Sequence, residues 1–286
     1  MTYRRSVLLV LGAMFAFAMM ALFTREANAP ILTIAAWRAI LVAAAFAIWA
    51  FVREGGAGAL RPTPGMLRVG VPYGLFLGLA SSTFVGGYAL TTVSNTIFFH
   101  NLAPVIAFPL AWKMYAEKPE EGALAGSAIA LAGVALLSGV SAFHFTQFTD
   151  SRFLLGDLLA ILSAVGYAGV LVWTKISRRQ QLPILGTLFW AWSIAAAILA
   201  VIALLFGSLS ISGTAFLWTL GLALLCTNLP FYLLSQGMRQ VSAGSAALLS
   251  MSEVLFATAL GAAVYGEGLS PAAWFGGVTQ RIAEED

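Results

Sequence analysis

The chain of 286 residues is 60% hydrophobic and only 9% charged, whereas about 25% of residues are charged in an average soluble protein. A soluble core does not need so much apolar surface, so the composition excludes a water-soluble globular protein and indicates a polytopic membrane protein. The net charge is +3, but the positions of Lys and Arg carry more information than their sum. The single cysteine, Cys226, excludes an internal disulfide and is expected to be a buried thiol.

The N-terminal apolar run follows a basic start and ends near small residues at 27–29, as a secretory signal peptide would. Arg25 and Glu26 precede these small residues, and Pro30 follows them directly. Because further apolar runs come afterwards, we expect an uncleaved first membrane span.

Nine apolar runs reach the roughly 20 residues that a helix needs to cross a bilayer, and a tenth begins near residue 270. The runs lack the alternating pattern of membrane β-strands, so helices are expected. They cover residues 6–24, 31–52, 67–89, 93–115, 121–143, 155–176, 184–206, 213–236 and 242–265. After residues 271–278 the tenth run turns to TQRIAEED, which cannot cross hydrocarbon. Either this helix is cut short or the tail is not its natural continuation.

Positive residues are distributed unevenly between alternate connections. With the N-terminus in the cytoplasm, twelve Lys and Arg lie in inside segments, two (Arg25 and Arg152) lie outside, and Arg38 lies within a span. Cytoplasmic segments of membrane proteins carry such an excess, so both termini are predicted to be cytoplasmic. The inside residues are Arg4, Arg5, Arg53, Arg61, Arg68, Lys113, Lys118, Lys175, Arg178, Arg179, Arg239 and Arg281.

An offset of about 150 residues relates the two halves of the chain. Residues 104–117 and 254–267 share four identities at this offset, Ala107/Ala257, Leu110/Leu260, Tyr115/Tyr265 and Glu117/Glu267. Further matches are Thr24-Arg25 with Thr174-Lys175 at 150, and Pro30-Ile31-Leu32 and Trp37 with Pro183-Ile184-Leu185 and Trp190 at 153. Three anchors in one order indicate a duplication, and chance similarity between hydrophobic helices is the alternative.

The duplication predicts a first five-helix repeat at residues 1–148 and a second at residues 149–286. Because five is an odd number, the second repeat enters the membrane from the opposite side, which gives an inverted repeat. The predicted fold is therefore an all-α polytopic membrane protein with ten transmembrane helices in two inverted repeats, the tenth helix being incomplete.

The ends of the fourth and ninth spans carry a resemblance to a known family. Ala103-Pro104 runs to Glu117, and Glu253-Val254 runs to Glu267-Gly268. With this pattern, the chain resembles the EamA-repeat exporters of the bacterial drug/metabolite transporter superfamily, and among them the YddG-type exporters of aromatic amino acids. The first copy has Ala where the family has Glu, and the second has Val where it has Pro. The resemblance implies a bacterial inner-membrane exporter of small amphipathic metabolites that works by alternating access around a central cavity.

Polar side chains deep in a span are costly, so each is a candidate for substrate binding. Glu253 could receive an amine or a proton, or it could fix helix packing. His100 and the adjacent Asn101 could bind substrate and suit proton linkage, and a hydrogen-bonded packing histidine is the alternative. Asn228 could hydrogen-bond the substrate or the helix backbone that is interrupted near Pro230. Arg38 could clamp a carboxylate, but it lies close enough to the interface to extend toward it.

Aromatic side chains could stack on a flat apolar group of a substrate, and any single one of them could belong to the core instead. The predicted cavity-wall residues are Phe17, Tyr88, Tyr167, Trp190 and Tyr232. Proline removes a helical hydrogen bond, so a proline within a span predicts a hinge or a static kink. The predicted hinges are Pro104, Pro109 and Pro230. Gly74 and Gly78, four residues apart, are typical of close helix packing.

A secondary transporter is the function that these features favour. The sequence has no phosphate-binding Gly-Lys-Ser/Thr loop for direct use of ATP. It also has neither the paired residues of a catalytic site nor the charged rings of a channel, so an intramembrane enzyme or a channel is the less favoured alternative. The expected substrates are aromatic amino acids, with drugs or other amino acids as the alternative. The expected partners are this small molecule and membrane lipid, without nucleic acid, cofactor or metal, and the expected state is a monomer.

Overall fold

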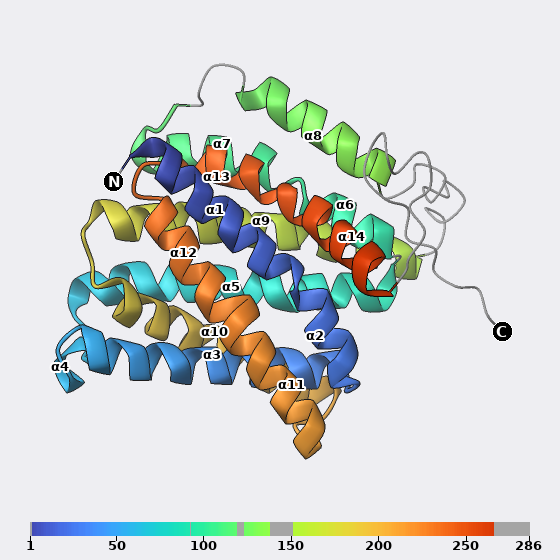
Figure 1. Ribbon diagram of the computed structural model, residues 1–286, viewed down its shortest axis with the longest axis horizontal. Coiled ribbons are helices and arrows are strands. Elements are labelled where there is room, and N and C mark those ends of the chain that lie inside the picture. The colour runs from blue at the N-terminus through green and yellow to red at the C-terminus, as the bar shows by residue number, and fades with distance from the viewer. Residues whose placement is uncertain (1, 92, 119–122, 138–150, 266–286) are drawn as a thin grey trace.

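The computed structural model describes residues 2–91, 93–118, 123–137 and 151–265, and the regular elements in these ranges are all helical (Figure 1). The first half contains α1 (Tyr3–Ala18), α2 (Met20–Ala27), α3 (Ile31–Arg53), α4 (Ala57–Leu60), α5 (Pro64–Leu90), α6 (Val93–His100), α7 (Ala103–Tyr115) and α8 (Ala123–Leu137). The second contains α9 (Ser151–Arg179), α10 (Ile184–Phe206), α11 (Gly213–Ala223), the π-helix η3 (Leu224–Asn228), α12 (Leu229–Gly237), α13 (Ala243–Ser250) and α14 (Ser252–Tyr265).

Eight helical stretches of the described chain are long and apolar enough to cross a membrane. They are Tyr3–Ala27, Ile31–Arg53, Pro64–Gly87, Asn95–Tyr115, Ser151–Arg179, Ile184–Phe206, Gly213–Gly237 and Ala243–Gly261, and α8 adds a shorter apolar stretch, Ala125–Val134. These nine stretches coincide with the first nine predicted spans, so the chain is a polytopic membrane protein. The tenth predicted span lies outside the described residues, and both the total of ten helices and the inverted repeat stay predictions.

The helices form two layers around α9. In one layer, α3, α10, α5 and α9 lie side by side in this order, and α6 and α7 pack against the other side of α9 (Figure 1). In the second layer, α1 packs against α12, α13 and α14, while α11 packs against α2 and α3. Because α9 also contacts α12 and α13, it is one of the helices that join the layers.

Glycines let α5 approach its neighbours closely. A Cβ atom on Gly74 would lie 2.6 Å from the carbonyl oxygen of Ala191, and one on Gly78 would lie 2.6 Å from Cδ1 of Ile198. Both neighbours belong to α10, so the predicted packing role of this glycine pair is confirmed. On the other side of α5, a Cβ atom on Gly166 of α9 would lie 2.5 Å from the backbone nitrogen of Ala80.

The fourth, eighth and ninth spans are interrupted. Asn101 and Leu102 separate α6 from α7, and Met251 separates α13 from α14. Asn101 and Met251 are 150 residues apart in the sequence, so the fourth and ninth spans break at equivalent positions of the predicted repeat. Two predicted hinge residues begin a helix just after an interruption, Pro104 in the first turn of α7 and Pro230 in the first turn of α12. The third, Pro109, lies inside α7.

The second helix of each predicted repeat makes a reciprocal contact with the other repeat. α3 and α10 each have 23 residues, each has a proline as N-cap, and the two pack against each other. The indole N–H of Trp37 donates to the carbonyl of Leu209, which follows α10, at 2.8 Å. The indole N–H of Trp190 donates to the carbonyl of Leu60, which follows α3, at 3.2 Å. The start of each helix therefore lies near the end of the other, and the pair is antiparallel.

Candidate functional site

The interruption of the fourth span positions His100 against α9. Its Nδ1 lies 2.8 Å from Oγ of Ser163, and the Ser163 hydroxyl donates to the carbonyl of Ala160 at 2.6 Å. Because that bond uses the hydroxyl proton of Ser163, the imidazole Nδ1–H is the donor to Ser163. Aromatic rings flank the imidazole, with ring centroids 4.6 Å away for Phe84 and 5.3 Å away for Tyr167.

Tyr167 connects His100 to the interruption of the ninth span. Its hydroxyl is buried, close to the Ser250 side chain and within electrostatic range of Glu253. Ser250 ends α13 and Glu253 lies in the first turn of α14. The structure therefore gathers three of the predicted site residues, His100, Tyr167 and Glu253, around α9 between the two broken spans. We call these three residues the break-point cluster.

The two predicted asparagines bind backbone instead. Asn101 Nδ2 donates to the carbonyl of Ile97 in its own helix at 2.8 Å. Asn228 Nδ2 donates to the carbonyl of Val42 in α3 at 3.2 Å, while its Oδ1 is buried without a partner. Asn228 ends the π-helix, and such π-segments often occur at functional sites. The Asn101 side chain is therefore hydrogen-bonded within its own helix. The Asn228 side chain links α3 to the eighth span, and its carbonyl oxygen Oδ1 accepts no hydrogen bond.

The predicted aromatic residues lie in different places. Phe17 is 6% exposed and packs edge-on against Phe231, with ring centroids 5.3 Å apart, so it belongs to the core. Trp190 is held at the start of α10 by its bond to Leu60 and does not line the cavity described below. Tyr88 belongs to α5, but its side chain lies outside the described part of the chain. Tyr232 lines the cavity.

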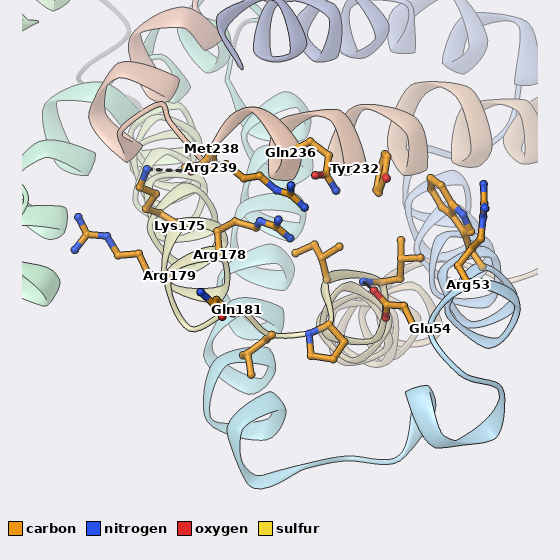
Figure 2. Close-up of a pocket in the computed structure, with 15 residues that line it drawn as sticks. Arg53, Glu54, Lys175, Arg178, Arg179, Gln181, Tyr232, Gln236, Met238 and Arg239 are labelled. Atoms are coloured by element: carbon orange, nitrogen blue, oxygen red, sulfur yellow. Dashed lines mark hydrogen bonds between the residues drawn. The ribbon is translucent and has the colours of Figure 1, made fainter. Parts of the chain in front are cut away.

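A large cavity opens at the end of the bundle where α3, α9 and α12 end and α10 begins (Figure 2). Its volume is about 990 Å³, at the upper end of the roughly 300–1,000 Å³ of small-molecule sites. Its lining residues come from both predicted repeats: Trp49, Arg53, Glu54, Lys175, Arg178, Arg179, Gln181, Leu182, Pro183, Ile184, Leu185, Tyr232, Gln236, Met238 and Arg239. Trp49 and Tyr232 form an aromatic wall, with ring centroids 4.5 Å apart.

Several charged groups that line the cavity have structural partners. The Glu54 carboxylate accepts from the backbone N–H groups of Leu185 and Gly186 at 3.1 and 3.0 Å, and so caps the first turn of α10. Lys175 Nζ is buried and donates to the carbonyls of Met238 and Val241 at 2.9 and 2.7 Å, which ties the turn after α12 to α9. These contacts fix the walls of the cavity.

Another glutamate near the cavity binds one of the lining arginines. Glu117 accepts from Arg179 at 3.1 Å and from the backbone N–H of Ala243, at the start of α13, at 2.9 Å. Arg179 therefore anchors the end of the fourth span to α9. Within the described residues, no group of three or more His, Cys, Asp and Glu side chains could hold a metal ion.

Arg38 packs against side chains within the helix bundle. Its Nη1 lies 3.2 Å from Sδ of Met20, its Cζ lies 6.0 Å from the ring centre of Trp192, and its Nε is buried without a partner. From the sequence, a clamp on a carboxylate and an extension to the interface were both open for this residue, and its closeness to Pro30 favoured the interface. From the sequence, the basic lining residues of the cavity indicated only the cytoplasmic side of the membrane, although Arg178, Arg179 and Arg239 share the inside face of the predicted bundle.

Comparisons with known proteins agree with this architecture. The profile of the EamA-like transporter family matches residues 4–139 and 154–280. A protein of Archaeoglobus fulgidus named as an uncharacterized transporter is 30% identical over 227 residues, which cover 77% of this chain and 78% of that protein. The uncharacterized transporter YwfM of Bacillus subtilis is 30% identical over 190 residues, which cover 64% of this chain and 60% of YwfM.

A solved structure shares the fold. It superposes with a TM-score of 0.78 over 95% of this chain and 92% of its own chain, at 21% sequence identity. At this identity the likeness concerns the fold alone. Because the family profile matches most of both halves, the chain belongs to the EamA-like transporter family of the drug/metabolite transporter superfamily and is a membrane transporter.

Proposed function

We propose that this chain is a secondary transporter that exports small amphipathic metabolites, foremost aromatic amino acids, by alternating access. The observation that carries the proposal is the cavity of about 990 Å³, because helices of both predicted repeats line it and it opens at one end of a bundle of membrane-spanning helices. The Trp49–Tyr232 wall, with ring centroids 4.5 Å apart, offers a flat apolar surface to an aromatic ring.

Broken helices in equivalent spans support the alternating-access part of the proposal. The fourth and ninth spans break at positions 150 residues apart, and transporters with internal repeats place substrate near such discontinuous helices. The break-point cluster lies between the two interruptions. We place the occluded substrate next to this cluster, and we assign the cavity to the state that is open to the cytoplasm.

The reciprocal contacts of α3 and α10 support the inverted repeat. Trp37 and Trp190 occupy equivalent positions, and each donates to the backbone that follows the other helix. Two antiparallel helices with exchanged contacts are what a two-fold axis in the membrane plane produces. The family profile, which matches residues 4–139 and again residues 154–280, supports the same division of the chain.

The distribution of charge supports the proposed orientation. The cavity opens on the face that carries Arg53, Arg178 and Arg239, which the excess of positive charge assigns to the cytoplasm. An exporter in the inner membrane would collect its substrate from this side. Drugs and other amino acids are alternative substrates, and an enzyme or a channel is the less favoured alternative.

Counterflow in proteoliposomes tests the proposal. Purified protein is reconstituted with unlabelled phenylalanine inside the vesicles, and uptake of labelled phenylalanine is followed at two external pH values. Saturable uptake that requires internal phenylalanine is expected. Conversion of the substrate to a product would indicate an enzyme, and flux that does not saturate would indicate a channel. A panel of amino acids and cationic drugs in the same assay separates the alternative substrates.

A further inference from the structure

We propose that Arg178 and Arg239 bind the carboxylate of the transported solute inside the cavity, so that the protein selects anionic or zwitterionic aromatic solutes and rejects organic cations. This inference rests on the proposed transport function and specifies the class of its substrate. It differs from the sequence-based expectation that the ammonium or carboxylate of the substrate binds at Glu253, His100 or the asparagines.

The first reason is the balance of charge in the cavity. Glu54 is the one carboxylate among the lining residues, and both of its oxygens accept backbone N–H groups of α10. Five basic residues line the same space, Arg53, Lys175, Arg178, Arg179 and Arg239. A solute cation would meet net repulsion here, whereas a carboxylate would meet a surplus of positive charge.

The second reason is that the guanidinium groups of Arg178 and Arg239 face the cavity and form no ion pair with a carboxylate in the described chain. The ion pair seen in this region joins Arg179 to Glu117 and leaves Arg178 and Arg239 out. Nε of Arg178 is buried and has no hydrogen-bond partner. Leaving such a donor unsatisfied is costly, and this cost favours a ligand that supplies an acceptor.

The third reason is geometric. Arg178 lies within electrostatic range of Arg239, which repels it, of Tyr232 in the aromatic wall, and of Glu54, whose carboxylate oxygens are already bound by α10. Figure 2 shows the Arg178 and Arg239 side chains extending into the same part of the cavity, from α9 and from the turn after α12, with Gln236 and Tyr232 beyond them. A carboxylate between the two guanidinium groups would relieve their repulsion and could accept paired N–H bonds. The body of the solute could then lie along Tyr232 and Trp49.

A phosphate of an anionic lipid could satisfy the same two arginines, and the test must separate it from a solute. We commit to the solute because the aromatic wall continues the site with a surface suited to a planar ring. Binding is measured by isothermal titration calorimetry on protein in nanodiscs of phosphatidylcholine, and again in nanodiscs that contain phosphatidylglycerol.

Three probes share one phenyl ring and differ in their charged groups. They are 3-phenylpropanoate, which has a carboxylate only, L-phenylalanine, which has both groups, and 2-phenylethylamine, which has an ammonium only. We expect the first two to bind with similar affinity and the third to bind at least tenfold more weakly. Arg178→Gln and Arg239→Gln should each weaken 3-phenylpropanoate binding about ten- to hundredfold, the usual value of a charge-assisted hydrogen bond.

Two further variants complete the design. Arg61→Gln removes a positive charge from an exposed residue that does not line the cavity, and it should leave binding unchanged. Arg178→Lys keeps the charge but loses the paired geometry, so it should bind more weakly than wild type and more tightly than Arg178→Gln. Thermal unfolding of each variant shows whether it is folded. If Arg178→Gln does not fold, Arg178→Lys still tests the proposal.

Several results would overturn the inference. These are preferential binding of 2-phenylethylamine, unchanged affinity in both Gln variants, or loss of 3-phenylpropanoate binding when phosphatidylglycerol is present. If the inference fails while phenylalanine counterflow persists, the transport function stands without this substrate class. If carboxylates bind as expected but no solute shows counterflow, the binding site stands and the transport function fails.

Discussion

Two stretches of α9 differ in whether their polar side chains have hydrogen-bond partners within the protein. Along residues 156–174, α9 packs against α5 and α6, and Asp157 and Thr174 of this stretch are hydrogen-bonded to other helices. Asp157 Oδ1 accepts from Thr91 at 2.6 Å and from Asn95 at 3.1 Å. Near the other end of this stretch, the hydroxyl oxygens of Thr174 and Tyr73 are 2.7 Å apart. Asp157 and Thr174 therefore have hydrogen-bond partners where water is excluded.

The last turn of α9 is the opposite case. Lys175 and Arg179 have partners within the protein, but Arg178 between them faces the cavity with a buried Nε that has none. Arg239, from the turn after α12, adds a second positive charge. The same helix thus carries hydrogen-bonded polar side chains at Asp157 and Thr174 and, in its last turn, a guanidinium group whose Nε has no partner.

Paired and unpaired polar groups are expected to have different roles, in stability and in solute binding respectively. Where each group has its partner, a substitution removes packing or a hydrogen bond, so we expect it to lower the free energy of unfolding. Where groups lack partners, a substitution removes a potential contact to a solute, so we expect it to change binding with little loss of stability. Measuring both stability and transport flux on the same variants therefore tests whether paired groups contribute to stability and unpaired groups to solute binding.

The largest loss of stability is expected for Gly166→Ala. The new Cβ atom would lie 2.5 Å from the backbone nitrogen and 2.7 Å from Cα of Ala80. Because both are backbone atoms of α5, a side-chain rotation cannot relieve the overlap, and the helices must separate. Overpacking of this kind costs about 1–3 kcal/mol or more. Thermal unfolding in detergent, followed by size-exclusion chromatography with fluorescence detection, measures the shift.

Gly133→Ala is the matched control, because a Cβ atom on this helical glycine of α8 would have no atom within 4 Å. Alanine also favours a helix over glycine, so this variant should be at least as stable as wild type. Equal stability of the two variants would show that the α5–α9 interface is not tightly packed.

A smaller loss is expected for Asp157→Ala, which leaves the Thr91 hydroxyl and the Asn95 amide without the acceptor that they share. Unsatisfied buried donors cost about 1–3 kcal/mol, and thermal unfolding should show an intermediate shift. Asp157→Asn retains an acceptor oxygen and should lose less. If Asp157→Ala matched wild type, the pairing along this stretch of α9 would not contribute to stability.

The fold could be predicted largely from the sequence, because the length of apolar runs and the placement of Lys and Arg respond directly to the bilayer. The break between α6 and α7 lies about one turn before Pro104. Proline has no backbone N–H to donate to the preceding turn, so an interruption is predicted there. The matching break at Met251 has no proline nearby and could be anticipated only from the repeat. The match of α3 with α10 followed in the same way from two Pro-Ile-Leu segments.

The candidate site was harder to predict, because a sequence shows which residues are polar but not which ones meet. His100, Tyr167 and Glu253 come from three spans, and only the packing of α9 between the broken spans brings them together. Trp190 looked like part of a cavity wall, but its indole N–H is used by the carbonyl of Leu60. From the sequence, the arginines of the cavity indicated only which side of the membrane is cytoplasmic. Whether they are free to bind a solute depends on which carboxylates already form ion pairs, and a sequence does not show this.

The smallest effect on stability, combined with a clear loss of flux, is expected for the break-point cluster. His100→Ala removes the bond to Ser163, and Glu253→Gln removes an ionisable carboxyl group that has no ion-pair partner among the described residues. Each variant should insert normally and lose no more than about 1.5 kcal/mol, the usual value of one hydrogen bond, while phenylalanine counterflow falls severalfold. Ser82→Ala is the control, because its hydroxyl bonds the carbonyls of Gly78 and Leu79 in its own helix. If flux in both variants equalled that of the control, the cluster would be a packing feature, and recognition would have to reside in the positively charged cavity alone.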